Sequence, residues 1–167
     1  MKKNISGKDP QMMIRMGNIR DLPEMQKLFE ETITEVCRKD YSPEQLEAWK
    51  SGAENEERWQ KVIRKQIVFI TESEGTITGF ATLDKGNYID LLFVHKDFQH
   101  QGIASLLYRQ VELEAIKQRQ LYITAHVSKT AKPFFEKSGF TVLQEQSVPL
   151  RGTVLTNYKM EKKLIGS

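Results

Sequence analysis

The sequence contains very little cysteine, and this scarcity excludes several kinds of site. Its 167 residues include a single cysteine, Cys37. One cysteine cannot form a disulfide within the chain, and it cannot build a cysteine-rich metal site. Because Cys37 follows Ile33 and Val36 at helical spacing, we expect a small buried apolar side chain rather than a nucleophile.

Long apolar runs and a strong net charge are also missing. The longest apolar runs, such as Leu91–Val94, are far shorter than the about 20 residues that a membrane-spanning helix needs. No apolar stretch follows the basic start Met1–Asn4, so we expect no signal peptide. The formal net charge is only +3 and the basic residues are interspersed with acidic ones, unlike the basic face of a nucleic-acid-binding protein. We therefore expect a cytoplasmic protein that binds neither membranes nor nucleic acid, with homodimer formation left open.

Helical and strand-like patterns alternate along the chain. Residues 1–11 are polar and contain glycine and proline, so we expect a flexible tail before a single domain over 12–167. Helical spacing of apolar residues predicts helices over 21–36, 43–51, 55–65, 103–117 and 132–138. Short β-rich runs bounded by turn residues predict strands over 12–16, 66–71, 76–83, 88–94, 121–127, 140–144 and 154–160.

The order of these elements predicts an α/β domain with a mixed sheet. The three strands over 66–94 are joined by short turns, which is typical of an antiparallel meander. A helix separates the strands over 88–94 and 121–127, so these two can run parallel.

Two helix starts carry capping signals. Asp21 is expected to accept hydrogen bonds from free backbone N–H groups, and Glu24 is expected to favour the positive helix end. At the next helix, Ser42 is the expected cap, Pro43 fits the first position, and Gln45 can reach back to the cap.

The most informative loop follows the strand that ends in Leu91–Val94. It reads Gln99-x-x-Gly102-x-Ala104 and leads directly into a helix. The first turn of a helix has unpaired N–H groups and a partial positive charge, which suit a pyrophosphate. Gly102 lets a phosphate approach the backbone, and Ala104 and Ser105 keep the next turn small. The dinucleotide pattern G-x-G-x-x-G and the P-loop are both absent. By itself this short motif is equally compatible with a plain loop and helix cap.

A second motif lies over Ser128–Phe140. It reads Ser-x-x-Ala131, then Phe134-Phe135, then Gly139-Phe140. The two motifs together resemble those of the GNAT acetyltransferase family, (Gln or Arg)-x-x-Gly-x-(Gly or Ala) and then Asn-x-x-Ala, two aromatics and Gly-Phe. The order of elements from residue 12 to residue 160 also matches this family, within a bacterial subgroup of poorly defined substrate.

The resemblance implies a GNAT-like, mostly antiparallel sheet whose central parallel strands splay apart to hold acetyl-CoA as acyl donor, flanked by helices. The pantetheine arm would bond to the backbone of Leu92, Phe93 and Val94 as an added strand does. The pyrophosphate would lie on the amides of Gln99, His100, Gln101, Gly102, Ile103, Ala104 and Ser105. The other wall would be lined by Ser128, Phe134 and Phe135.

Two positions depart from the family pattern. Ser128 stands where the family often has Asn, which shortens one contact to the arm. Phe135 stands where the family often has the Tyr that protonates the departing thiolate. Because a thiol has a pKa near 8.5, the thiolate is a tolerable leaving group without that acid.

Four side chains are candidates for catalysis by acid or base. Asp90 interrupts an apolar strand, and strict alternation would place it on one face with Leu92 and Val94, close to the thioester. It is the first candidate for the base, and a structural Asp bound to backbone or to an Arg is an equal alternative. His126 is the second candidate for the base, with a strand-end histidine as the alternative.

The phenols Tyr158 and Tyr122 are candidates for the missing acid, although packing of aromatic residues on a strand is the favoured interpretation for both. A backbone N–H near Val94 is expected to bind the oxyanion. His95 and His100 fall in the loop, and the histidine spacing predicts no metal site.

The family resemblance implies transfer of an acetyl group from acetyl-CoA to a primary amine of a small molecule or protein, by direct attack in a ternary complex. Tyr41, Trp49 and Trp59 fall on the early helices that would cover the acceptor, where they could shape a pocket or simply form core. The alternative is a CoA-binding regulatory domain without catalysis, which Phe135 keeps open.

Overall fold

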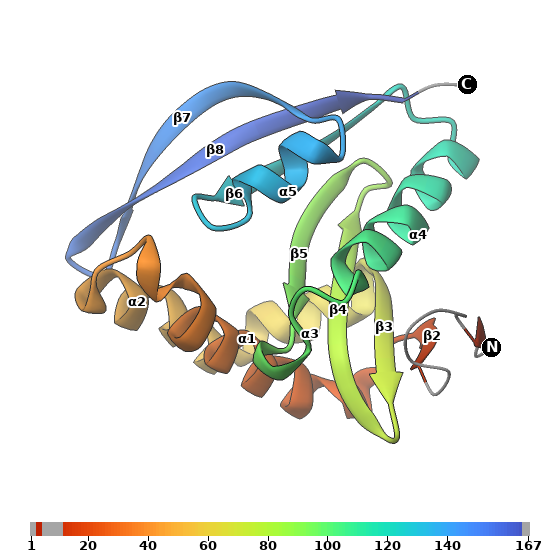
Figure 1. Cartoon of the computed structure of the whole chain (residues 1–167), viewed down its shortest axis with the longest axis horizontal. Coiled ribbons are helices and arrows are strands. Elements are labelled where there is room, and N and C mark those ends of the chain that lie inside the picture. Colours follow the sequence, from red (N-terminus) through yellow and green to blue (C-terminus); the bar gives the residue numbers. More distant parts are fainter. Residues whose placement is uncertain (1–2, 5–11, 165–167) are drawn as a thin grey trace.

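The protein is built on a mixed β-sheet of eight strands in the order β1-β2-β3-β4-β5-β6-β8-β7 (Figure 1). The computed structural model describes residues 3–4 and 12–164. The strands are β1 (Lys3–Asn4), β2 (Met12–Met16), β3 (Ile67–Ser73), β4 (Thr76–Asp84), β5 (Tyr88–Val94), β6 (Tyr122–Ser128), β7 (Thr141–Leu150) and β8 (Thr153–Lys163). Neighbouring strands are antiparallel except for β5 and β6, which are parallel. The predicted α/β class, meander and parallel pair are confirmed.

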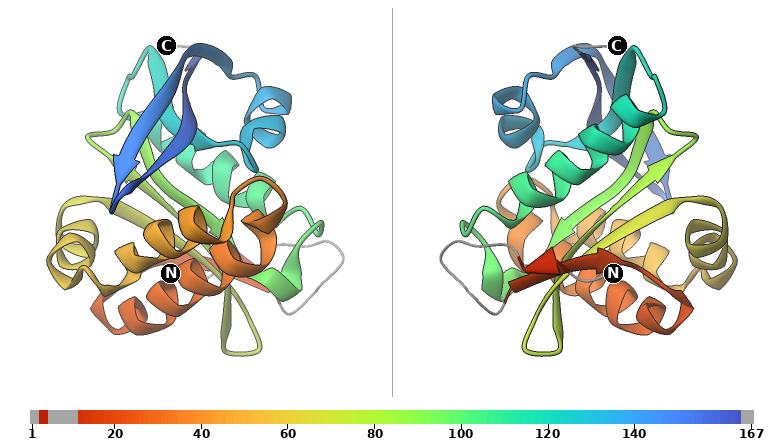
Figure 2. Two further views of the ribbon diagram at one scale, coloured as in Figure 1. Left: turned by 90° about the vertical axis from the view of Figure 1, so that its left-hand side faces the viewer. Right: turned by 90° about the vertical axis from the view of Figure 1, so that its right-hand side faces the viewer.

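Helices cover both faces of the sheet (Figure 2). They are α1 (Leu22–Val36), α2 (Pro43–Lys50), α3 (Glu56–Lys65), α4 (Ile103–Lys117) and α5 (Lys132–Lys137), with short 3-10 turns over Ile19–Asp21, Cys37–Lys39, Ser51–Glu54 and Lys96–Phe98. Leu107 and Val111 of α4 share one core with Phe135 of α5. Ile33 of α1 and Trp59 of α3 belong to a second core on the opposite face. The apolar stripes of these helices therefore supply two cores, one on each side of the sheet.

The parallel strands β5 and β6 stay paired over only a short stretch. Their register joins Tyr88 to Thr124 and Ile89 to Ala125 and goes no further. Beyond this point the two strands diverge, as Figure 1 shows. This confirms the predicted splay, and the backbone edges of both strands face a gap in the middle of the sheet.

The hairpin of β7 and β8 is much longer than the sequence predicted. β7 runs over Thr141–Leu150 rather than 140–144, and β8 runs over Thr153–Lys163 rather than 154–160. β7 is an edge strand and largely exposed, so it lacks the apolar alternation that marks a half-buried strand. Pro149 is tolerated because an edge strand leaves N–H groups without ladder partners.

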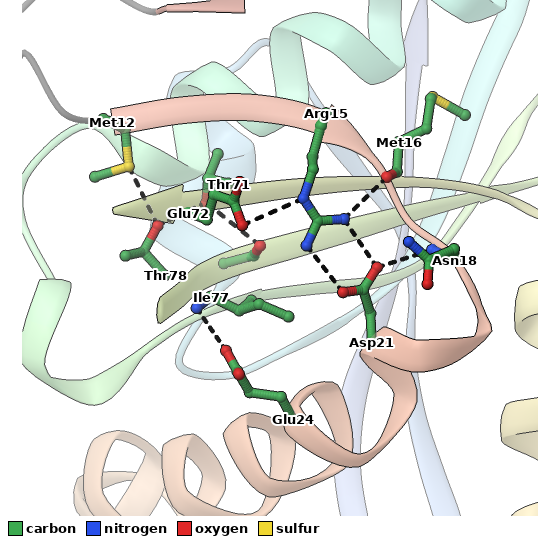
Figure 3. A network of polar contacts seen from close by, with 11 residues as sticks. Met12, Arg15, Met16, Asn18, Asp21, Glu24, Thr71, Glu72, Ile77 and Thr78 are labelled. Carbon is green, nitrogen blue, oxygen red and sulfur yellow. Dashed lines mark hydrogen bonds and ion pairs between the residues drawn. The ribbon is translucent and has the colours of Figure 1, made fainter. Parts of the chain in front are cut away.

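The predicted cap at Asp21 is wrong. Its side chain makes no capping bond to α1 and instead accepts two hydrogen bonds of 2.9 Å from Arg15 on β2 (Figure 3). Asn18 caps the preceding 3-10 turn. Burial alone would raise the pKa of Asp21, but the hydrogen bonds from Arg15 and the Asn18 N–H outweigh it and lower that pKa. An acidic residue at a helix start thus serves to anchor β2 to α1.

The other expectations near the helix starts fare differently. The capping box of Ser42 and Gln45 is confirmed. Glu24 accepts a hydrogen bond from the Ile77 N–H of β4, which ties α1 to the sheet (Figure 3).

Lys3 and Asn4 pair with β2 instead of belonging to a loose tail. The remainder of the expected tail, residues 1–2 and 5–11, lies outside the described residues.

Candidate functional site

The gap between β5 and β6 exposes backbone groups of β5. The N–H of Leu91 bonds to Thr82, and the N–H of His95 bonds to Thr78, so both point toward β4. Because N–H groups alternate in direction along a strand, those of Leu92 and Val94 point the other way, into the gap. The backbone predicted to hold a pantetheine arm is therefore oriented to accept an added strand.

The start of α4 lies at the mouth of this gap. Gly102 is the N-cap residue in a left-handed conformation (φ 81°), and it has no side chain with which to cap the helix. The first intrahelical bond at this end is donated by Leu106 to the Gly102 carbonyl. The N–H groups of Ile103, Ala104 and Ser105 are thus left for an anion, which the helix dipole also favours. His100 is a further left-handed position (φ 61°), and such strain in a non-glycine residue is typical of functional loops.

Side chains fix the loop against the end of β5. Gln99 donates from Nε2 to the Val94 carbonyl at 2.7 Å, and Thr32 of α1 donates to the same carbonyl at 3.1 Å. Lys96 pairs with Glu31 of α1 at 3.7 Å. The side chain of Gln99, the first residue of the motif, therefore holds the loop in place. Any contact of Gln99 with a ligand is expected from its backbone.

A single cleft of about 1040 Å³ joins the gap, the α4 start and the face of the sheet under α1–α3. Small-molecule pockets usually measure about 300–1,000 Å³, so this cleft lies at the upper end of that range. Most of the predicted site residues line it, namely Asp90, Leu92, Phe93, Val94, Gln99, His100, Gly102, Ile103, Ala104, Ser105, His126, Ser128, Phe134 and Phe135. Gln101 and Tyr158 are not among its lining residues; the ring of Tyr158 instead packs under the ammonium of Lys132 at 4.6 Å.

Asp90 lies on the opposite face from the one that strict alternation predicted. Thr82 pairs with Leu91 and Leu83 pairs with Ile89, so Asp90 is the extra residue of a β-bulge. Leu92 and Val94 pack on the α4 face, whereas Leu91 and Phe93 pack on the face of α1–α3. The bulge turns Asp90 toward α3, a change that no periodicity in the sequence reveals.

Both carboxylate oxygens of Asp90 are engaged on that face. Oδ1 accepts from Arg58 Nη2 at 3.0 Å, and Oδ2 accepts from Gln66 Nε2 at 2.9 Å. The Asp90 side chain is only 15% exposed, yet it still lines the cleft. The alternative of an Asp paired with an Arg is therefore observed, and it leaves each oxygen with a lone pair for water.

His126 and Tyr88 lie close together next to Asp90. The exposed His126 of β6 points to the same face, and its ring meets the Tyr88 ring edge-on at 5.5 Å. Burial, and secondarily the charge of Asp90, raises the pKa of Tyr88. The point where β5 and β6 separate is thus flanked by a carboxylate, an imidazole and a phenol.

The opposite wall of the gap contains Ser128 and the two phenylalanines. Ser128 Oγ accepts from the Ala131 N–H at 3.1 Å, which shapes the turn into α5. Phe135 is 4% exposed and packs against Phe140 with centroids 5.0 Å apart. Phe134 is half-buried. An aromatic ring fills the space at Phe135, but no proton donor is present at that position.

A buried polar cluster beside Ser128 carried little signal in the sequence. Tyr41 accepts from the Lys129 N–H at 2.9 Å and donates to the Thr156 carbonyl at 2.7 Å, which links the connection between α1 and α2 to β8 and to the residue after β6. Burial raises the pKa of Tyr41 to about 12 and that of the cleft-lining Cys37 to about 11. Arg58 was missed altogether, since an arginine on a helix of mixed charge carries no signal.

An uncapped helix start beside an open strand edge defines a site that suits an elongated, phosphate-bearing ligand, and the same cleft continues to the face of the sheet under α1–α3. Residues 37–162 match the acetyltransferase (GNAT) domain family. The chain therefore belongs to the GNAT family, and it is an N-acetyltransferase.

Individual relatives agree with this assignment. The chain is 32% identical over 152 residues to the uncharacterized N-acetyltransferase YafP of Escherichia coli (strain K12), covering 91% of this chain and 96% of that protein. A crystal structure of a GCN5-related N-acetyltransferase from Rhodopseudomonas palustris superimposes with a TM-score of 0.87 at 31% identity, covering 90% and 94% of the two chains. The PaiA N-acetyltransferase of Thermoplasma acidophilum, solved with coenzyme A, has the same fold with a TM-score of 0.74 at 21% identity, covering 91% and 98%.

Two further properties concern the described residues only. Within residues 3–4 and 12–164, no cluster of three or more His, Cys, Asp or Glu side chains could hold a metal ion. None of the helices described is long and apolar enough to cross a membrane.

Proposed function

We propose that the protein transfers an acetyl group from acetyl-CoA to a primary amine by direct attack. The observation that carries this proposal is the gap between β5 and β6, with the α4 start at its mouth and the N–H groups of Leu92 and Val94 along one edge. A structural neighbour of 21% identity is solved with coenzyme A, which supports the same ligand here. We call this region, with Ser128 and α5 on its far wall, the cofactor side.

The direction of the gap assigns the two N–H groups. The loop that leads to the α4 start contacts the Val94 carbonyl, so an arm anchored there passes Val94 first and reaches Leu92 nearer the closed end. Whereas the sequence favoured an N–H near Val94 for the oxyanion, we therefore assign the Val94 N–H to a pantetheine carbonyl and the Leu92 N–H to the thioester oxygen. A preorganised N–H donor at that oxygen stabilises the negative charge that develops during attack.

The reaction balances with the groups that line the cleft. The amine nitrogen forms a bond to the thioester carbon, the carbon–sulfur bond breaks, and its electron pair stays on sulfur as the CoA thiolate. The amine proton passes through water to Asp90, our first candidate, or to His126, our second. Both residues line the cleft on the face of the sheet under α1–α3. Phe135 donates no proton, so the thiolate takes its proton from solvent, which its pKa allows. No geometric observation supports Tyr158 as the acid.

A covalent acyl-cysteine is disfavoured as an intermediate. Cys37 lines the cleft, but burial raises the pKa of its thiol to about 11. Because the thiolate is the nucleophilic form, almost none is present at neutral pH. Direct attack by the amine in a ternary complex needs no such nucleophile.

Thiol release from acetyl-CoA in the presence of a panel of primary amines tests the proposal, with mass spectrometry to identify an N-acetyl product. We expect amine-dependent release of one thiol per acetylated product. Tight CoA binding without release for any amine would instead favour a CoA-binding regulatory domain, the alternative that Phe135 keeps open.

A further inference from the structure

The cavity next to the closed end of the gap has an unusual wall of aromatic rings. Phe93 of β5 lies between Leu92 and Val94 and points to the face under α1–α3. The ring of Phe29 from α1 lies 4.9 Å from it, and that of Trp49 from α2 lies 6.5 Å from it. Tyr41 packs edge-on against Trp49 at 5.3 Å. Rings from three separate elements thus meet beside the thioester position.

Part of this wall is open to the cleft. Phe29 and Tyr41 are buried, whereas Trp49 and Phe93 are only half-buried and both line the cleft. The exposed parts of Trp49 and Phe93 therefore offer flat apolar surface to whatever enters next to the acetyl group. We call the wall of Phe29, Trp49 and Phe93, with Arg58, Asp90 and His126, the acceptor side.

The charges on the acceptor side do not suit a polycation. The described lining residues include two carboxylates, Asp40 and Asp90. Asp40 accepts from Thr130 at 2.7 Å, and Asp90 is held by Arg58 and Gln66. Arg58 also lines the cleft and contributes a positive charge of its own. An acceptor with several ammonium groups would find little compensating charge, whereas an apolar body loses nothing by entering.

We propose that the acceptor is a small molecule in which a primary amine is attached to a flat apolar body such as an aromatic ring. The ring packs on the open faces of Trp49 and Phe93, and the amine nitrogen reaches the thioester beside Leu92. Aromatic contacts of this kind add to the free energy gained by burying apolar area. This inference rests on the proposed acetyl transfer, and it names the substrate class of that same site.

The experiment compares kcat/KM for four amines, each calculated on the concentration of the unprotonated primary amine, with acetyl-CoA at saturation. They are 2-phenylethylamine, hexylamine, spermidine and a short lysine peptide. We expect 2-phenylethylamine to exceed hexylamine about 5–10-fold, because ring stacking favours a flat partner. We expect it to exceed spermidine and the peptide by about 100-fold, because neither of these fills an apolar pocket.

Substitutions at Trp49 sharpen the comparison. Trp49→Leu keeps an apolar side chain but removes the flat face, so the ratio of 2-phenylethylamine to hexylamine should fall to about one. Trp49→Phe restores a ring and should recover most of the ratio. Leu113→Ala is the control: Leu113 is a 53% exposed apolar residue on α4 that does not line the cleft, and its replacement should leave the ratio unchanged.

The outcomes separate this inference from the proposed function. Efficient acetylation of spermidine, hexylamine or the peptide above 2-phenylethylamine would overturn the aromatic acceptor and leave acetyl transfer standing. An unchanged ratio in a folded Trp49→Leu variant would also overturn it. Calorimetric CoA binding without thiol release for any amine would refute the proposed function itself. The wild-type ratios decide the matter even if Trp49→Leu fails to fold.

Discussion

The cofactor side of the cleft is made largely of backbone, whereas the acceptor side is made of side chains. On the proposed cofactor side, the N–H groups of Leu92 and Val94 and those of the first turn of α4 all lie within one continuous stretch of chain. The acceptor side collects Phe29, Trp49 and Arg58 from three helices, together with residues of β5 and β6. A backbone site depends on the fold and tolerates many side chains, so the two sides should respond differently to substitution.

The largest effect is expected from a charge at the α4 start. Gly102→Asp places a carboxylate where the pyrophosphate must lie, and we expect CoA affinity to fall by more than about 100-fold through repulsion and lost N–H contacts. Gly75→Asp is the matched control, because both glycines have φ of 81° and open space at the Cβ position. The control carries the same backbone strain far from the cleft and should keep wild-type affinity. Equal affinity in both variants would place the pyrophosphate elsewhere.

Asp90 tests whether a side chain on the acceptor side takes part in proton transfer. Asp90→Asn keeps the shape of the side chain but cannot take a proton, so turnover should fall about 100-fold while CoA affinity stays unchanged. The same two measurements on His126→Gln show whether His126, the second candidate for the base, takes part in proton transfer. A lower melting temperature with normal turnover per folded molecule, at neutral and at high pH, would make Asp90 a purely structural partner of Arg58.

Substitution of Tyr41 tests the two hydrogen bonds that tie the connection between α1 and α2 to the sheet. Tyr41→Phe removes the hydroxyl that binds the Lys129 N–H and the Thr156 carbonyl. Two partly buried backbone groups then lose their partner, and we expect the free energy of unfolding to drop by about 1–3 kcal/mol. Urea unfolding measures this change. An undiminished stability would mean that water replaces the hydroxyl and that the link is not needed.

The smallest effect is expected at Cys37. Its pKa of about 11 leaves only a very small fraction of thiolate near neutral pH, and only the thiolate is nucleophilic. Turnover of Cys37→Ala should therefore stay close to wild type, and the rate of alkylation of Cys37 by iodoacetamide should rise about tenfold per pH unit and level off only near pH 11. Loss of turnover in a folded Cys37→Ala variant, with ping-pong kinetics in the wild type, would replace direct attack with an acyl-enzyme.

The same contrast explains what could be predicted from the sequence. The cofactor side is local, so the Gln99-x-x-Gly102-x-Ala104 pattern located the helix start and the adjacent strand edge correctly. The acceptor side depends on contacts between distant segments, which no local pattern encodes. The bulge at Asp90 reversed the expected face because one extra residue breaks two-residue alternation. Arg15, 6 residues away in the sequence, donates a hydrogen bond to the Asp21 side chain, which therefore does not cap α1 as predicted.

Residue-resolved amide hydrogen exchange, with and without saturating CoA, tests the central claim most directly. The N–H groups of Leu91 and His95 already bond to β4, so their exchange should change little. Those of Leu92, Val94, Ile103, Ala104 and Ser105 should become strongly protected when CoA bonds to them. Unchanged exchange at Leu92 and Val94, with protection appearing at other sites, would contradict CoA binding in the gap between β5 and β6.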